Sequence, residues 1–589
     1  MQEDPNQINF FAQTNSRGNA VPFGIKRKDR TRHMYVIGKT GMGKSTLLEN
    51  MAIQDIRNGE GIAFIDPHGS TADRIMEYVP AHRQRDVVYF APFDMEHPIA
   101  FNVMEDVGYD KRHLVVSGLL SAFRKIWVDA WSARMEYILS NTLLALLEFP
   151  GATLLDVNRL LINKTFRKKV VENVKDPLVK SFWVDEFANY TDRYTQDATP
   201  AIQNKVGQFT SNPLIRNIVG QPKSSFDIRQ LMDDKKILIM NLSKGRVGEV
   251  NATLLGSMLV TKIYLAAMSR ADVPLETMNK LPNFYFYVDE FQNFANESFS
   301  DILSEARKYK LNLLIAHQYV EQMEEEVRDA VFGNVGTTVA FRVGPFDAEV
   351  LETIFNPQFT ATDLVNLGFA QIYLTLMIDG VGSPPFSATT LPPFDLPPER
   401  FVEQVLAYSR ATYGKPRAQV ESAIDEWHKL DAFVPETKPK KDYRPAPKTA
   451  PAPAPVKEAP PQHVHHPTPE VKKEVEILHK AAAAPAPPRA EERRTQAPLG
   501  GEAAPHTKPQ KPPLVGAKSL REALQMATGA KIPPLYSAEA SQGKHAKDLK
   551  ETLGKVAPEA AKPKEHKPPE LSQEKLREML AVEPLDDAS

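Results

Sequence analysis

Residues 38 to 45 read Gly-Lys-Thr-Gly-Met-Gly-Lys-Ser, which matches the phosphate-loop pattern G-x-x-x-x-G-K-[ST] at every fixed position. Glycines let the backbone curl until successive N–H groups point at one anion. Lys44 would supply a positive charge to the β- and γ-phosphates, and Ser45 a hydroxyl to Mg²⁺. The segment predicts a nucleotide site. Its predicted binding residues are Gly38, Lys39, Thr40, Gly41, Met42, Gly43, Lys44, Ser45 and Thr46.

Two adjacent carboxylates, Asp289 and Glu290, end the apolar and aromatic run 283–288. Side chains alternate between the faces of a strand, so neighbouring carboxylates reach one site only at a strand end. In a phosphate-loop enzyme Asp289 would hold Mg²⁺, usually through water, and Glu290 would position and polarise the attacking water. Alone, such a run also fits an ordinary strand exit. Together with residues 38–45 it favours nucleotide hydrolysis.

Gln318 follows a third apolar run, residues 311–317. At the tip of a strand beside the Asp-Glu strand, its amide could hydrogen-bond the γ-phosphate or its water. The alternative is a surface glutamine at a strand exit.

These side chains need a sheet to bring them together. Residues 1–435 alternate strand-like and helix-like segments, a pattern typical of a mostly parallel sheet with helices on both faces. Apolar runs at 35–37, 61–66, 86–90 and 236–240 predict strands. From 107 to 227 helical periodicity dominates, which predicts an all-α insertion. The predicted fold class is therefore α/β, with segments 1–30 (N-terminal segment), 31–106 and 228–400 (core), 107–227 (insertion), 401–435 (helical extension) and 436–589 (tail).

Composition limits the alternatives. The 589 residues contain no cysteine, which excludes disulfides and cysteine-based metal sites and fits a reducing cytosol. The N-terminus is polar and is not a signal peptide. The longest apolar stretch, Leu254 to Met268, contains Lys262 and predicts a buried helix. The sequence therefore predicts a cytoplasmic chain without a membrane anchor of its own.

Residues 436–589 are rich in proline, alanine and lysine, as in Ala450 to Pro455. Such stretches cannot bury enough apolar surface to offset the entropy of ordering, so we expect a disordered, extended tail. Two short amphipathic segments, Ser519 to Met526 and Ser572 to Val582, are either docking helices or marginal helices without a role. The basic character of the tail suggests a tether for nucleic acid or partner proteins.

The motifs in this order resemble the HerA/FtsK superfamily of ring translocases, and within it the type IV secretion coupling proteins of the TraG/TraD kind. The matching stretches are Val36 to Thr46, Phe64 to Gly69, Tyr285 to Phe294 and Glu305 to Gln318. The resemblance implies a RecA-like P-loop NTPase core that binds ATP and Mg²⁺ between the subunits of a homo-oligomeric, hexameric ring. It also implies that hydrolysis moves DNA.

One further residue comes from the resemblance. Family members place an arginine at the end of the helix after the Asp-Glu strand, where it reaches across a subunit boundary. Arg307, in Ala306-Arg307-Lys308, matches that position. The alternative is a solvated basic helix end, and Arg342 is the second candidate for this arginine. Candidate DNA contacts are Lys205, Lys244, Arg246 and the run 167–169.

The chain departs from membrane-bound coupling proteins because it shows no N-terminal spanning helices. It would then either dock on a separate membrane-embedded partner or belong to a soluble branch of the superfamily. Two alternatives remain within the superfamily: an ATPase that moves protein in secretion or pilus assembly, and a DNA-processing translocase like HerA. A third is a binding module in which ATP only switches conformation.

Overall fold

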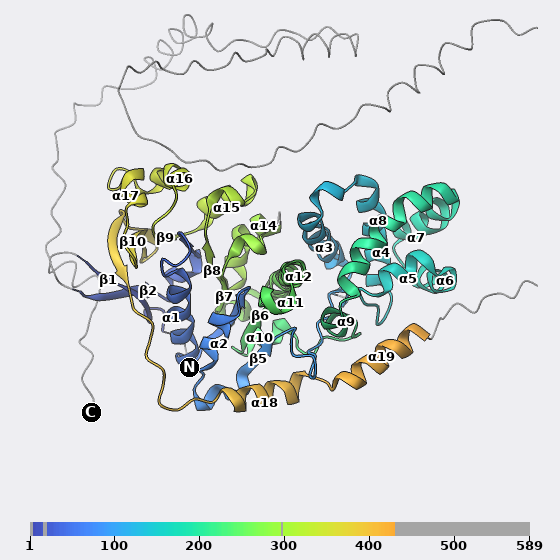
Figure 1. Cartoon of the computed structure of the whole chain (residues 1–589), viewed down its shortest axis with the longest axis horizontal. Helices are drawn as coiled ribbons and strands as arrows, with labels where there is room; N and C mark the ends of the chain where they lie inside the picture. Colours follow the sequence, from blue (N-terminus) through green and yellow to red (C-terminus); the bar gives the residue numbers. More distant parts are fainter. Residues whose placement is uncertain (1–3, 16–19, 106, 296–297, 430–589) are drawn as a thin grey trace, which may run out of the picture. The chain divides into compact units, whose positions relative to one another are not determined.

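The computed structural model describes residues 4–15, 20–105, 107–295 and 298–429 (Figure 1). The predicted tail, residues 436–589, and its two amphipathic segments lie outside the described residues.

An eleven-stranded sheet forms the centre of the fold. The six neighbouring pairs from β9 to β5 are parallel, and the four pairs from β2 to β9 are antiparallel. This confirms the mostly parallel sheet. In spatial order the strands are β2 (Pro22–Lys26), β1 (Ile8–Thr14), β13 (Phe386–Thr390), β10 (Gln371–Thr375), β9 (Thr337–Ala340), β3 (Met34–Ile37), β8 (Leu311–His317), β7 (Phe284–Val288), β4 (Gly61–Asp66), β6 (Ile237–Asn241) and β5 (Val87–Phe90).

The N-terminal residues differ from the expectation. Residues 1–30 were predicted as an N-terminal segment outside the core, but they contribute two strands to the main sheet. β2 is the edge strand, and β1 lies between β2 and β13, which comes much later in the chain. Phe11, Phe23 and Ile25 are buried there. This pairing joins residues more than 370 positions apart, so no local pattern could indicate it.

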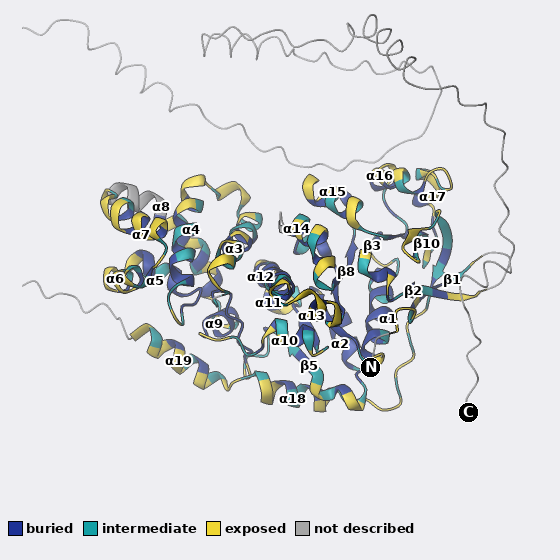
Figure 2. Ribbon diagram, turned by 180° about the vertical axis from the view of Figure 1, so that it is seen from behind, coloured by how far each residue is buried: buried dark blue, intermediate teal, exposed yellow. Residues whose placement is uncertain are grey.

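Helices cover both faces of the sheet. Along β3, Met34 and Val36 belong to one apolar cluster, with α1 and α2, whereas Tyr35 and Ile37 belong to another, with α12, α14 and α15. Because side chains alternate between the two faces of a strand, neighbouring residues of β3 pack against the helices on opposite faces of the sheet. Figure 2 shows α12 and the central strands as mostly buried, whereas β10 near the edge of the sheet is partly exposed. These core helices are α1 (Lys44–Arg57), α2 (Ser70–Met76), α10 (Ile228–Asp233), α11 (Lys244–Val247), α12 (Glu249–Met268), α13 (Leu275–Lys280), α14 (Ser298–Glu305), α15 (Glu325–Asn334), α16 (Pro345–Phe355) and α17 (Ala361–Val365).

The insertion between β5 and β6 is helical throughout its described residues, as predicted for the fold class. Its first long helix, α3, packs along α12 of the core. A Cβ atom at Gly118 of α3 would lie 2.4 Å from Cγ2 of Thr261 in α12, so only glycine permits this approach. The insertion helices are α3 (Arg112–Ile126), α4 (Ala133–Leu147), α5 (Asp156–Ile162), α6 (Lys164–Asn173), α7 (Pro177–Ser181), α8 (Asp192–Thr210) and α9 (Pro213–Val219).

Two C-terminal helices, α18 (Val402–Tyr413) and α19 (Arg417–Lys429), connect the core with the insertion along one edge of the described chain (Figure 1). Ser409 of α18 accepts a hydrogen bond from the backbone of β5. At the other end, the Trp427 indole of α19 donates to the buried carboxylate of Asp156 in the insertion, 3.0 Å away. The described part of the extension predicted for residues 401–435, up to residue 429, thus links both parts.

One helical stretch, Glu249–Asp272, is long and apolar enough to cross a bilayer by length and composition. However, 72% of its most apolar window is buried inside the protein. This is the arrangement of a core helix, as predicted for residues 254–268.

Candidate nucleotide-binding site

The predicted site residues meet at the carboxyl ends of three adjacent parallel strands. β8 lies between β3 and β7, with Ile37 paired to His317 and Val288 paired to Ile315. The phosphate loop follows β3, Asp289 and Glu290 follow β7, and Gln318 follows β8. Parallel strands end at one edge of a sheet, which is where ligands bind in open α/β folds. The prediction that Gln318 ends the strand beside the Asp-Glu strand is confirmed.

The phosphate loop, residues 38–43, curls directly into the first turn of α1. Gly43 has φ of 115°, a conformation that favours glycine, and stands immediately before Lys44. Lys44 is 4% exposed, and its ammonium donates to the carbonyls of Gly38 at 2.7 Å and Lys39 at 3.3 Å. Burial lowers the pKa of Lys44, and the carboxylates of Glu290 and Asp289 oppose that shift. The ammonium therefore lies inside the curl of the loop.

Ser45 and Asp289 form the pair predicted to hold a metal ion. The Ser45 hydroxyl donates to Oδ2 of Asp289 at 2.7 Å. Asp289 is 1% exposed, and burial raises its pKa to about 6, with further increases from Asp66 and Glu290 and decreases from Ser45 and Lys44. Asp66 itself accepts three backbone N–H groups around the start of α2. It therefore supports the loop after β4.

Glu290 and Gln318 are joined in a hydrogen-bond chain that begins at the phosphate loop. The Thr40 hydroxyl donates to Oε1 of Gln318 at 3.0 Å, and Nε2 of Gln318 donates to Oε1 of Glu290 at 2.5 Å. The Glu290 backbone has φ of 50°, which is unfavourable for a side chain with a Cβ. The surroundings must therefore hold this residue in place.

Sequence reasoning missed Gln292. Its Nε2 donates to Oε2 of Glu290 at 2.5 Å, so the two oxygens of this carboxylate accept from two different glutamine side chains. The only sequence signal is position, two residues after Glu290, and no pattern distinguishes it from other polar residues after a strand.

The donor set suits Mg²⁺ bound together with a nucleotide. No group of three or more His, Cys, Asp or Glu that could hold a metal occurs among the described residues. Mg²⁺ is commonly held by one or two protein oxygens plus phosphate and water. The Ser45 hydroxyl and the Asp289 carboxylate, 2.7 Å apart beside the phosphate loop, fit that need.

The two candidate arginines lie in different places. Arg307 is exposed in the turn after α14, and no hydrogen bond or ion pair of its side chain is found within the described residues. Arg342 is half-buried after β9, and its carbonyl accepts from the N–H of Lys39 at 2.8 Å. Of the two, only Arg342 is bonded to the phosphate loop of its own chain, and the bond is made by its backbone carbonyl rather than by its guanidinium.

Most basic residues proposed as DNA contacts are engaged within the chain. Lys244 donates to Asn293 and Glu249, and the guanidinium of Arg167 donates to the carbonyls of Leu160 and Leu161. Lys205 is half-buried along its own helix. Lys168 and Arg246 are exposed, the latter stacked over Phe93.

Asp289→Asn should stabilise the metal-free protein at neutral pH. Because the pKa of Asp289 is about 6 when folded and the usual value is about 3.9, the folded state binds more protons between these values. Its stability therefore falls as pH rises through this range. Asparagine does not titrate, so the variant does not lose stability over this range. Relative to the wild type, its free energy of unfolding should be higher by roughly 3 kcal/mol above pH 7 and equal below about pH 4. Urea titrations in EDTA measure it, and an equal gain at pH 4 and pH 8 would contradict the titration of Asp289.

A comparison with protein families decides which family the chain belongs to. Residues 18–352, more than half of the chain, match the family described as the type IV secretion-system coupling protein DNA-binding domain. The chain belongs to this family. The resemblance drawn from the sequence motifs is therefore confirmed. No curated protein matches the sequence.

Several solved structures are similar to the chain. The conjugative coupling protein TrwB in complex with sulphate is 15% identical, with 68% of this chain and 98% of that chain covered and a TM-score of 0.49. TrwB in complex with ADP and Mg²⁺ is also 15% identical, with 64% and 89% covered and a TM-score of 0.48. VirB4 of Thermoanaerobacter pseudethanolicus is 14% identical, with 66% and 97% covered and a TM-score of 0.46. At these identities and scores, no functional conclusion rests on them.

Proposed function

We propose that this coupling-family protein is an Mg²⁺-dependent ATPase that binds DNA and moves it in type IV secretion or conjugation. The observation that supports this most strongly is the convergence of five side chains on one strand edge. A phosphate-binding lysine, a metal-binding hydroxyl and carboxylate, a second carboxylate and a glutamine lie together in a chain of the coupling-protein family. These residues are Lys44, Ser45, Asp289, Glu290 and Gln318.

Each residue has a separate task in this proposal. When ATP binds, the Lys44 ammonium leaves the loop carbonyls and binds the β- and γ-phosphates instead. The N–H groups of residues 38–46 surround the phosphate chain. Ser45 and Asp289 hold Mg²⁺, which when bound neutralises charge on the phosphate oxygens. Glu290 orients the attacking water and accepts its proton. Gln318 connects that carboxylate with Thr40 and so senses the loop that encloses the γ-phosphate.

The proposal includes a homo-oligomeric ring, with six subunits as in the superfamily that the motifs resemble. Arg307 would complete the site of the neighbouring subunit, because it is exposed and engages no partner within the described residues. Arg342 follows β9, where its backbone lies beside the phosphate loop of its own chain, and it is the alternative arginine, acting within one subunit. We also propose a cytoplasmic location at the membrane, reached through a membrane-embedded partner.

The test is the steady-state ATPase activity of the full chain with and without single- and double-stranded DNA. We expect Mg²⁺-dependent turnover that DNA stimulates and that Lys44→Ala abolishes, because the variant lacks the charge that binds the phosphates. Activity that depends on Lys44 but ignores both forms of DNA would favour a motor that moves protein in secretion. Unchanged turnover in Lys44→Ala would exclude this site as the ATPase centre.

A further inference from the structure

The backbone directly after Glu290 makes a tight turn, residues 291–295, called here the post-glutamate turn. The N–H groups of Asn293, Phe294 and Ala295 donate back to carbonyls within residues 290–291. Phe291 and Phe294 are fully buried, which anchors the turn on its apolar side. Glu290 directly precedes this turn, and its φ of 50° is unfavourable for a residue with a Cβ, so its backbone depends on the surrounding structure to hold it.

Lys125 holds the polar side of the post-glutamate turn, although it belongs to the helical insertion. It lies at the C-terminal end of α3, and its ammonium donates to the carbonyl of Gln292 at 2.6 Å and to the carbonyl of Ala295. Burial lowers the pKa of Lys125 to about 8; Lys244 lowers it further and Glu324 opposes the shift. Charged donors to carbonyl oxygens contribute more than neutral ones, so this contact is a strong restraint on the turn.

Gln292, whose carbonyl binds Lys125, also links the post-glutamate turn to the Glu290 carboxylate. Its carbonyl accepts from Lys125, and its side-chain amide donates to Oε2 of Glu290 at 2.5 Å. Asn293 adds a second link, because its amide donates to the Glu290 carbonyl and its Oδ1 accepts from Lys244. Two short steps therefore connect an insertion helix with the catalytic carboxylate.

We infer that Lys125 is a positioning residue that acts through Gln292, so that the placement of the helical insertion on the core controls the orientation of Glu290. This inference rests on the proposed ATPase function of the site and extends it to regulation. Any event that shifts α3 relative to the core changes the hydrogen bonds from Lys125 to the carbonyls of residues 292 and 295. Binding of a partner or of nucleic acid to the insertion is such an event. Hydrolysis then depends on the state of the insertion, through Lys125, which lies 165 residues before Glu290 in the sequence.

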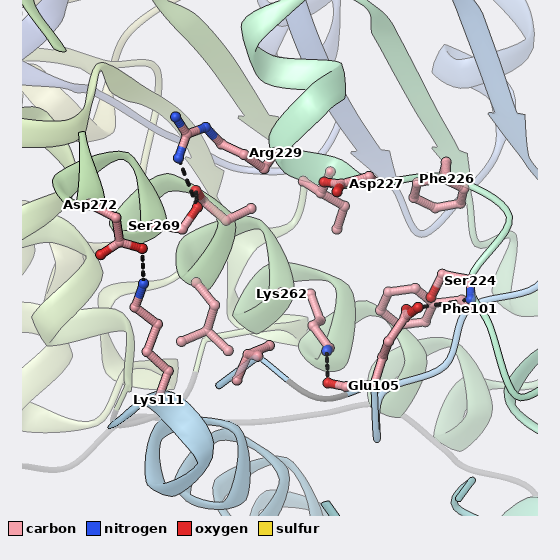
Figure 3. A pocket seen from close by; sticks show the side chains of 14 residues that line it. Phe101, Glu105, Lys111, Ser224, Phe226, Asp227, Arg229, Lys262, Ser269 and Asp272 are labelled. Atoms are coloured by element: carbon pink, nitrogen blue, oxygen red, sulfur yellow. Dashed lines mark hydrogen bonds and ion pairs between the residues drawn. The ribbon is translucent and has the colours of Figure 1, made fainter. Parts of the chain in front are cut away.

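The opposite end of α3 provides a matched control. Lys111 forms an ion pair with Asp272 of the core, and both residues line a cavity of about 340 Å³ with Arg229 and Lys262 (Figure 3). None of the described residues that line this cavity belongs to the nucleotide site. Lys111 and Lys125 thus both connect the insertion with the core, but only Lys125 contacts the post-glutamate turn.

The experiment compares Lys125→Met, Gln292→Ala and Lys111→Met in the full chain, each with MgATP. We expect Lys125→Met to lower kcat about 10- to 100-fold, because a charged hydrogen bond is lost, with KM unchanged within about threefold. Gln292→Ala should lower kcat similarly. In the Gln292→Ala background, Lys125→Met should have less than a threefold effect, because the two residues act in series. Lys111→Met should leave kcat within about twofold, because its ion pair with the exposed Asp272 does not contact the post-glutamate turn.

Hydrogen exchange of residues 291–295 gives a second readout that needs no hydrolysis. It should accelerate in Lys125→Met and stay unchanged in Lys111→Met. If wild-type protein shows no Lys44-dependent turnover, the proposed function fails, and hydrogen exchange alone decides whether Lys125 holds the turn. An unchanged kcat in Lys125→Met, a kcat loss matched by Lys111→Met, full additivity with Gln292→Ala, or unchanged exchange would overturn the positioning role.

Discussion

Glu290→Gln should reduce ATP turnover about 10²- to 10⁴-fold and leave MgATP affinity nearly unchanged. The amide cannot accept the proton of the attacking water, so the chemical step loses its base. Ser45, Asp289 and Lys44 make no hydrogen bond to the Glu290 side chain, so the groups proposed to bind phosphate and metal keep their positions. Steady-state turnover and equilibrium binding of a fluorescent ATP analogue measure the two quantities separately.

Lys44→Ala is the control for that experiment, because it should lose nucleotide affinity as well as turnover. The contrast between the two variants separates binding from chemistry. A Glu290→Gln protein that keeps more than a tenth of wild-type turnover would remove Glu290 from its proposed role. A wild-type protein that binds ATP in a Lys44-dependent way but does not hydrolyse it would favour the binding module, in which ATP only switches conformation.

The positions in the fold that the sequence predicted correctly are those encoded by local spacing. The phosphate loop sits between a strand and a helix because its glycines, its lysine and the flanking apolar runs are contiguous. Asp289, Glu290 and Gln318 lie at one edge because each ends an apolar strand, and parallel strands share their carboxyl ends. The mostly parallel sheet and the helical insertion follow from the same periodicities.

The features that the sequence could not reveal depend on contacts between distant residues. The pairing of β1 with β13 and the contact of Lys125 with residues 292 and 295 join segments whose local patterns are ordinary. No local pattern distinguishes Lys125, and Lys244 was predicted as a DNA contact. The structure instead places both ammonium groups on the post-glutamate turn. The sequence shows that these positions carry a positive charge, but tertiary packing determines which groups the two lysines contact.

Arg307→Ala should lower ATP turnover about 10³-fold or more while leaving ATP affinity and stability close to those of the wild type. A guanidinium that approaches the γ-phosphate neutralises charge that develops in the transition state, so its loss affects chemistry more than binding. Arg307 is exposed, so its removal leaves no cavity in the core. Turnover, nucleotide affinity and urea titration curves of the purified variant give the three comparisons.

Mixing Arg307→Ala with Lys44→Ala tests whether Arg307 acts on a neighbouring subunit. Each protein alone is inactive, but in a random mixed ring about a quarter of the interfaces combine an intact Lys44 with an intact Arg307 from the next subunit. Activity should then reappear on mixing. If Arg307 acted within its own chain, no mixed interface would be complete and activity would stay absent. Arg342→Ala supplies the contrast: its backbone lies beside the phosphate loop of its own chain, and if its guanidinium acts within that chain, activity should stay absent when the variant is mixed with Lys44→Ala.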